Sequence, residues 1–289
     1  MSKLDAPSAA DIKAFAMRHP GAMRSSWSEQ APAFLLAGTA MLAAIAAFLA
    51  LDISWARVFS GIGELGRIMT LMLPPDYGSI DKLTMWTKAL AETLAIAFLG
   101  TVLAAILAFP VGLLAARNVV PIWLVRFLLR RSLDTVRGVD TLIWALIWIN
   151  VVGLGPFAGV LAIMASDFGT FGKLFSEAIE AADRRPVEGV HSVGGNQLEA
   201  VRFGIVPQVL PVILSQILYY FESNTRSATI IGIVGAGGIG LHLSEQIRTL
   251  EWQHVSVIVL MILATVATID FISSRLRFVV IGRHSQVES

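Results

Sequence analysis

Two oppositely charged side chains interrupt an otherwise apolar run near residue 220. Glu222 and Arg226 are four residues apart, so on a helix they lie on one face. An arginine alone near the middle of a bilayer costs about 2.5–3.5 kcal/mol on insertion scales, and pairing with a carboxylate reduces that cost. The pair therefore either joins helices as an internal ion pair or, with Asn224 nearby, offers a guanidinium to an anion entering a polar cavity.

A glycine-rich run, GAGGIG at residues 235–240, follows soon after this pair. Its spacing fits G-x-G-x-x-G, but a nucleotide site would need a preceding strand and a downstream acid, whereas a long apolar segment precedes this run. Two readings remain: a loose connection, or an unwound segment that packs closely beside a polar path. We favour the second, because glycine permits close backbone approach, and its candidate residues are Gly235, Gly237 and Gly238.

A polar island at residues 186–207 is set between long apolar segments. Pro186 suits the first turn of a helix, and Glu188 lies in the same turn, where the helix dipole favours an anion. The glycines at 194–195 break that helix, and Asn196 with Glu199 has the spacing of a capping box for the next one. An apolar stripe at near-helical spacing is formed by Val187, Val190 and Val193. Such a self-capped element between two spans predicts a docking site for a partner protein.

No catalytic constellation is present in the sequence. His191, His242 and His254 lack metal-ligand spacing, and we find neither a nucleophile–base pair nor a phosphate-binding loop with its lysine. We therefore expect no cofactor on this chain. If the protein moves a solute against a gradient, the energy must come from another subunit.

Composition identifies a membrane protein. Hydrophobic residues make up 55% of the chain and charged residues 15%, mean hydropathy is +0.71, and cysteine is absent. A bilayer-spanning helix needs about 20 apolar residues. We predict an all-α polytopic protein with about six spans, at residues 33–51, 89–116, 139–153, 156–175, 205–234 and 254–272. Glu92 and Asp167 are isolated charges inside two of them.

Basic residues orient these spans. Five arginines follow the second span, and by the positive-inside rule their loop is cytoplasmic: Arg117, Arg126, Arg130, Arg131 and Arg137. Counting from this loop places the 186–207 island, Arg275, Arg277 and Arg283 on the same side. The five arginines could also bind anionic lipid, although the topological signal alone accounts for them.

The remaining segments complete the predicted organisation. Residues 1–32 form a cytoplasmic tail without a cleavable signal, so the first span is a retained anchor. Residues 52–87 carry an amphipathic helix on the outer face, ended by Pro74 and Pro75. A core at 88–280 and a cytoplasmic C-terminal tail at 281–289 follow.

The island resembles the cytoplasmic signature of ABC importer permeases, which reads EAA, three residues, Gly, nine residues, I-x-L-P. Glu188, Gly194 and Pro207 occupy matching positions. The chain departs from the signature at four positions: Gly189, Val190, Gly204 and Val206. The resemblance implies ATPase-coupling residues, namely Val187, Glu188, Val190, His191, Gly194 and Pro207.

A longer stretch, residues 202–240, is similar to the permease subunit of phosphonate-type ABC importers, and the likeness extends over roughly residues 85 to 280. It implies a type I importer permease fold in the inner membrane and a translocation path for phosphonate, phosphate or phosphite near Arg226, Glu222, Asn224 and the glycine run. It also implies a second copy of the chain, two ATPase subunits that bind ATP and Mg²⁺, and an extracytoplasmic binding protein.

Two other classes compete with this interpretation. An ion-coupled secondary transporter would show an internal repeat and its own intramembrane carboxylate site, and no repeat is visible. A membrane enzyme of lipid or cell-wall metabolism would cluster acids, histidines or metal ligands at one membrane face, and the sequence shows no such cluster.

Overall fold

The computed structural model describes residues 27–51 and 54–282, with side chains described for 31–51 and 54–278. Most of these residues are helical: α2 Trp27–Ala50, α3 Trp55–Leu71, α4 Ile80–Ala115, α5 Trp123–Arg137, α6 Thr141–Val152, α7 Pro156–Glu180, α8 Arg184–Ser192, α9 Gln197–Glu199, the π-helical η1 Ala200–Ile205, α10 Val206–Ile233, α11 Ile239–Arg248 and α12 Trp252–Gly282. The chain divides into two units after Arg67. Most of the predicted N-terminal tail, and Arg283, lie outside the described residues.

Five of the described helices are long and apolar enough to cross a membrane: α2, α4, α7, α10 with its preceding turns, and α12. A sixth crossing is reached when α5 and α6 are counted together as one span bent by 87°. The predicted all-α protein with about six spans is therefore confirmed. The amphipathic segment after the first span also forms a helix, α3.

The third span is corrected by the structure. The predicted segment at 139–153 forms α6, whose 12 residues rise only about 18 Å. A hydrocarbon core is about 30 Å thick. The preceding arginine-rich segment is not a loop, as predicted, but the helix α5. It packs on α7 at two glycines. An added Cβ would lie 2.8 Å from the Arg137 backbone nitrogen at Gly169 and 2.6 Å from a Leu133 methyl carbon at Gly172.

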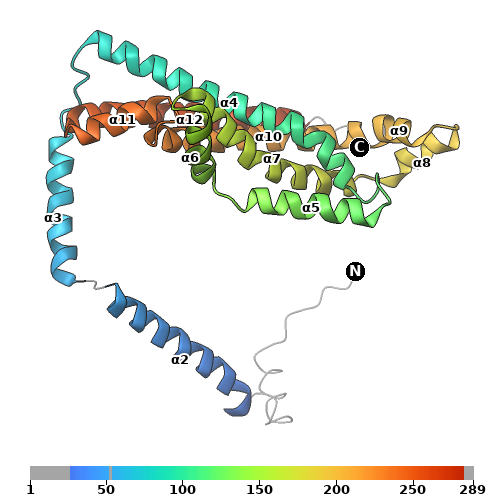
Figure 1. Ribbon diagram of the computed structural model, residues 1–289, viewed down its shortest axis with the longest axis horizontal. Helices are drawn as coiled ribbons and strands as arrows, with labels where there is room; N and C mark the ends of the chain where they lie inside the picture. Colours follow the sequence, from blue (N-terminus) through green and yellow to red (C-terminus); the bar gives the residue numbers. More distant parts are fainter. Residues whose placement is uncertain (1–26, 52–53, 283–289) are drawn as a thin grey trace, which may run out of the picture. The chain divides into compact units, whose positions relative to one another are not determined.

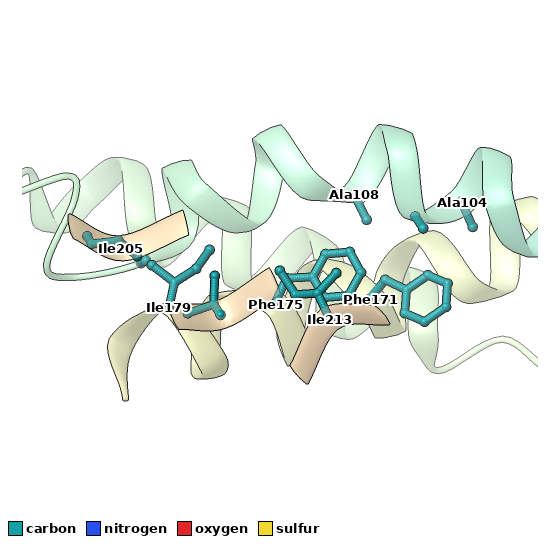
Figure 2. Close-up of a cluster of buried hydrophobic side chains, with 10 residues drawn as sticks. Ala104, Ala108, Phe171, Phe175, Ile179, Ile205 and Ile213 are labelled. Carbon is teal, nitrogen blue, oxygen red and sulfur yellow. The ribbon is translucent and has the colours of Figure 1, made fainter. Parts of the chain in front are cut away.

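Small residues bring α4 and α7 together along much of their lengths. An added Cβ would lie 2.7 Å from Ile163 at Gly100 and 2.9 Å from Phe175 at Gly112. Figure 2 shows Ala104 and Ala108 of α4 facing Phe171 and Phe175 of α7, with side chains from η1 and α10 completing the cluster. Without a hydrophobic driving force inside lipid, such close van der Waals contact is a main source of helix association.

Figure 1 shows α8 and α9 at one end of the bundle made by α4, α7 and α10, and α11 at the other end. The glycine run between α10 and α11 lies at that second end and is tightly packed. An ideal Cβ at Gly240 would lie 2.0 Å from the Thr229 carbonyl oxygen, and one at Gly232 would lie 2.5 Å from the Gly237 carbonyl oxygen. These neighbours are backbone atoms, so a side chain could be accommodated only by moving a helix.

We expect Gly240→Ala to lower the free energy of unfolding of the permease by about 1–3 kcal/mol, because the new methyl group overpacks a backbone contact. Gly189→Ala is the matched control, since nothing lies within 4 Å of its added Cβ, and alanine favours helix by up to about 1 kcal/mol. Thermal melting of the purified variants measures both. Equal melting temperatures for Gly240→Ala and wild type would contradict the packing of the glycine run.

Candidate functional site

The 186–207 island folds as its spacing predicts. Asp183 caps α8, accepting from the Arg185 N–H at 3.1 Å, so the helix begins at Arg184, two residues before the predicted start at Pro186. Asn196 Oδ1 accepts from the Glu199 N–H at 2.9 Å, and the Glu199 carboxylate accepts from the Asn196 N–H at 2.8 Å. The predicted capping box is confirmed by both bonds.

A tight glycine turn links α8 to α9. Gly194 has a φ of +87°, a conformation that costs a side chain dearly, and the Gly195 N–H donates to the Val190 carbonyl at 2.9 Å. The exposed His191 keeps its Nδ1 3.1 Å from the Gly195 carbonyl oxygen. The turn therefore presents α8 and α9 as one rigid corner.

The three valines of the predicted stripe differ in how far they are buried. Val187 and Val190 are half-buried, and Val187 lies against Gly204 of η1, whose added Cβ would be 3.0 Å from the Val187 Cα. Val193 is instead 85% exposed, like Leu198 at 80%. Two apolar side chains thus project from the corner into the surroundings.

Glu188 completes this surface from α8. It is exposed and has no hydrogen bond or ion pair with any other described residue. Pro207, also exposed, lies in the first turn of α10, where it needs no N–H partner. The Glu188 carboxylate and the side chains of Val193 and Leu198 form a surface at the end of the bundle that is suited to a partner protein. We call this surface the α8–α9 corner.

The predicted ion pair is part of a larger cluster. Glu222 is 7% exposed, and its carboxylate contacts Arg226 at 3.6 Å and Arg277 of α12 at 3.0 Å. The Arg277 guanidinium also lies over the Tyr219 ring, 5.8 Å from its centroid. One buried carboxylate therefore neutralises only one of two guanidinium groups, and half of the Arg226 side chain remains exposed.

Arg277 takes a place that its sequence position did not suggest. We counted it among cytoplasmic charges beyond the sixth span, but α12 continues to Gly282 and brings Arg277 beside the middle of α10. Its partner is 55 residues away, so no local spacing could reveal it. The length of α12 is the reason, since the apolar residues after Arg277 extend the helix.

A cavity of about 700 Å³ opens beside this cluster. Its walls come from α7, α10 and α12: Leu174, Gln208, Pro211, Val212, Ser215, Gln216, Tyr219, Tyr220 and Arg277. The Gln216 Oε1 is buried and has no hydrogen-bond partner among the described residues. The walls are mainly apolar, with Arg277 as their one charged member.

Asn224 is held inside the bundle. It is 5% exposed, and its amide donates to Thr101 Oγ1 of α4 at 2.8 Å and to the Asp167 carboxylate of α7. Asp167 is equally buried, at 5%. These bonds satisfy polar groups that would otherwise be stranded in an apolar interior, and they join three helices. Asp167 was visible in the sequence as an isolated charge, but its partner was not.

The glycine run is anchored by α4. The half-buried Glu92 accepts from the Gly238 N–H at 2.9 Å, and Thr93 Oγ1 accepts from the Ile239 N–H at 2.8 Å. Both bonds reach the N-terminus of α11, where unpaired N–H groups favour an anion. Gly235, Gly237 and Gly238 all have positive φ and, with Glu92 and others, line a cavity of about 310 Å³. The run is an unwound, closely packed segment, not a loose connection.

Known proteins share this architecture. Residues 108–283 match the family described as binding-protein-dependent transport system inner membrane component. The chain is 38% identical over 231 residues to the putative phosphite transport system permease protein HtxC of Stutzerimonas stutzeri, with 80% of each protein covered. It is 36% identical to the phosphate-import permease protein PhnE of Mycolicibacterium smegmatis, over 84% of this chain and 46% of that protein.

Solved structures confirm the predicted fold. The permease in the inward-facing MetNI methionine ABC transporter has a TM-score of 0.62 at 17% identity, covering 70% of this chain and 99% of that one. A chain of an amino acid ABC transporter has a TM-score of 0.57 at 19% identity, covering 70% of this chain and 97% of that one. The secondary-transporter and enzyme alternatives find no support among these relatives. This chain therefore belongs to the binding-protein-dependent transport family and is a multi-pass inner-membrane permease subunit of an ABC importer.

Proposed function

We propose that this permease forms the translocation path for phosphonate or a related phosphorus oxyanion, phosphite or phosphate. The observation that carries the proposal is the Glu222 cluster, where two guanidinium groups share one carboxylate beside a cavity. Arginine suits such a substrate because its planar fork can donate two parallel hydrogen bonds to phosphoryl oxygens. The names of the relatives, phosphite and phosphate permeases, agree with this choice.

The working complex in this proposal contains two copies of the chain, because one copy supplies only half of a path. Two ATPase subunits bind ATP and Mg²⁺ and dock on the α8–α9 corner from the cytoplasm. An extracytoplasmic binding protein delivers the substrate at the end where α11 lies. The exposed Glu188, Val193 and Leu198 support the docking step, since they are free to meet a partner.

Transport then couples two ends of the bundle. ATP binding closes the ATPase pair and moves the α8–α9 corner, which is continuous with α10 through η1. The helix α10 carries Glu222 and Arg226 and ends at the glycine run, so a shift of α10 reaches both the charged cluster and the outer end. In this scheme Gly235, Gly237 and Gly238 absorb the backbone change.

The proposed orientation has a direct test, because the chain lacks native cysteine. Ser79→Cys, at the start of α4, should react from outside intact cells with an impermeant thiol reagent. Ser192→Cys, at the end of α8, should react only after permeabilisation. Both serines are exposed, so access is decided by membrane side. Equal labelling of the two sites in intact cells would contradict the orientation.

The docking surface is tested by Glu188→Ala and Gly194→Val. Loss of a charge-assisted bond across the interface should weaken ATPase association about tenfold, and valine at a φ of +87° should distort the corner. Membrane insertion should be unchanged. Glu245→Ala, an exposed carboxylate on α11, is the control and should bind ATPase normally. Normal coupling in both island variants would refute the docking assignment.

The path is tested by Arg226→Gln. Because Arg277 remains 3.0 Å from Glu222, this variant strands no buried charge and should fold and assemble. Uptake of labelled substrate into proteoliposomes should fall at least about tenfold, and Arg226→Lys should recover little, because lysine lacks the bidentate fork. Arg275→Gln, an exposed arginine of α12, is the control.

Wild-type uptake by Arg226→Gln would show that Arg226 has no role in the translocation path beyond its ion pair with Glu222. The charge-swapped Glu222→Arg/Arg226→Glu is a poor substitute for this test. It would place a new guanidinium beside Arg277 and destabilise the cluster whatever the role of Arg226.

A further inference from the structure

A second charged site lies where α4 ends and α5 begins, away from the Glu222 cluster. It is a pocket of about 250 Å³ with four arginines in its walls. The lining residues are Arg117, Trp123, Arg126, Phe127, Arg130, Arg131 and Glu180. We call it the α5 arginine pocket. Because Glu180 is the last residue of α7 and Arg117 follows the end of α4, it lies at the ends of the membrane-spanning helices.

The charges in and around this pocket do not balance. Arg130 bonds to Glu180 at 2.6 Å, and the Arg117 Nε is 3.8 Å from the same carboxylate. Arg131 contacts Asp134 at 3.4 Å, but Asp134 is also bonded to Lys173, at 2.9 Å. Four arginines and a lysine thus face two carboxylates, which leaves a formal excess of three positive charges.

Arg126 contributes most directly to this excess. It is half-buried, its guanidinium donates a long hydrogen bond of 3.4 Å to the Arg117 carbonyl, and no carboxylate pairs with it among the described residues. The first turn of α5 adds to the positive potential, since the N-cap residue Ile122 makes no side-chain cap bond. The open N–H groups of this 15-residue helix therefore point toward the same end as the guanidinium.

The apolar surroundings of the pocket indicate which anion it meets. Trp123 and Phe127 stack with ring centroids 5.3 Å apart and are 66% and 42% exposed. Ile122 at the N-cap and Leu124 and Leu128 in α5 are exposed as well. Exposed aromatic and aliphatic groups among arginines are typical of a helix at the membrane–water interface, where arginine heads reach lipid phosphates.

We propose that the α5 arginine pocket binds a phosphate group, and that in the membrane this group belongs to an anionic lipid. The headgroup phosphate meets Arg126, Arg117 and the first turn of α5, while acyl chains cover Trp123 and its apolar neighbours. Arg130 serves mainly to hold Glu180 and the Ala115 carbonyl, so it builds the pocket wall. Lipid bound here would fix the junction between α4, α5 and α7.

The test measures lipid binding to the full-length permease in neutral detergent by native mass spectrometry. Phosphatidylglycerol should bind wild type more tightly than phosphatidylcholine. Arg126→Gln and Arg117→Gln should each weaken phosphatidylglycerol binding about fivefold, the effect of one basic residue near an anionic surface. Arg248→Gln, an exposed arginine at the end of α11, should bind phosphatidylglycerol like wild type.

Inorganic phosphate at matched ionic strength separates the two possible sources. If inorganic phosphate but not phosphatidylglycerol stabilises the wild type against heat, and Arg126→Gln loses this effect, the pocket binds soluble phosphate. The lipid would then be excluded, while the recognition of a phosphate group by Arg126 would stand. If Arg126→Gln binds phosphatidylglycerol and inorganic phosphate as tightly as the wild type does, the proposal is overturned. Arg126→Lys guards against misfolding, because it keeps the charge and should retain most phosphatidylglycerol binding.

Discussion

Close approach of α4 and α7 determines where most of the other core elements can lie. Glycine and alanine at the contact let the two backbones come together, with Phe171 and Phe175 filling the space toward α10. Inside a bilayer this contact is stabilised by van der Waals packing. Polar groups on the three helices must then find partners within the protein, because lipid offers none. Asn224 meets Thr101 and Asp167 under that constraint.

The same constraint distinguishes charged side chains that hold the fold together from those that remain available to a ligand. Asp167 and Glu92 both make contacts that hold the fold: one joins α7 to α10, and the other joins the glycine run to α4. The Glu222 cluster and the α5 arginine pocket differ because cations outnumber carboxylates in both. An uncompensated guanidinium near a bilayer is costly unless it meets water, an anion or a headgroup. These two places are therefore where a ligand is expected.

Local interactions explain why the α8–α9 corner was predictable. Its helix starts, its glycine turn and its capping box are set by residues within a few positions of one another. Five of the spans were predictable for a similar reason, since each is an apolar run of sufficient length. Where arginines interrupt the apolar residues of a helix, as in α5, the length of the apolar run does not predict the helix. Because of these arginines the segment was predicted as a loop, and the buried position of Leu133 was not recognised. Leu133 is 3% exposed and packs on α7.

The sequence by itself determined the all-helical class, about six spans, the capped corner and the family resemblance, because these depend on composition and on neighbours along one helix. The tertiary structure alone decided that Glu222 is shared by Arg226 and Arg277, that Asn224 is buried against Asp167, and that α5 and α6 form one bent pair. Those contacts join residues many positions apart. They depend on how far α12 continues and how closely α4 and α7 pack, and no local spacing encodes either quantity.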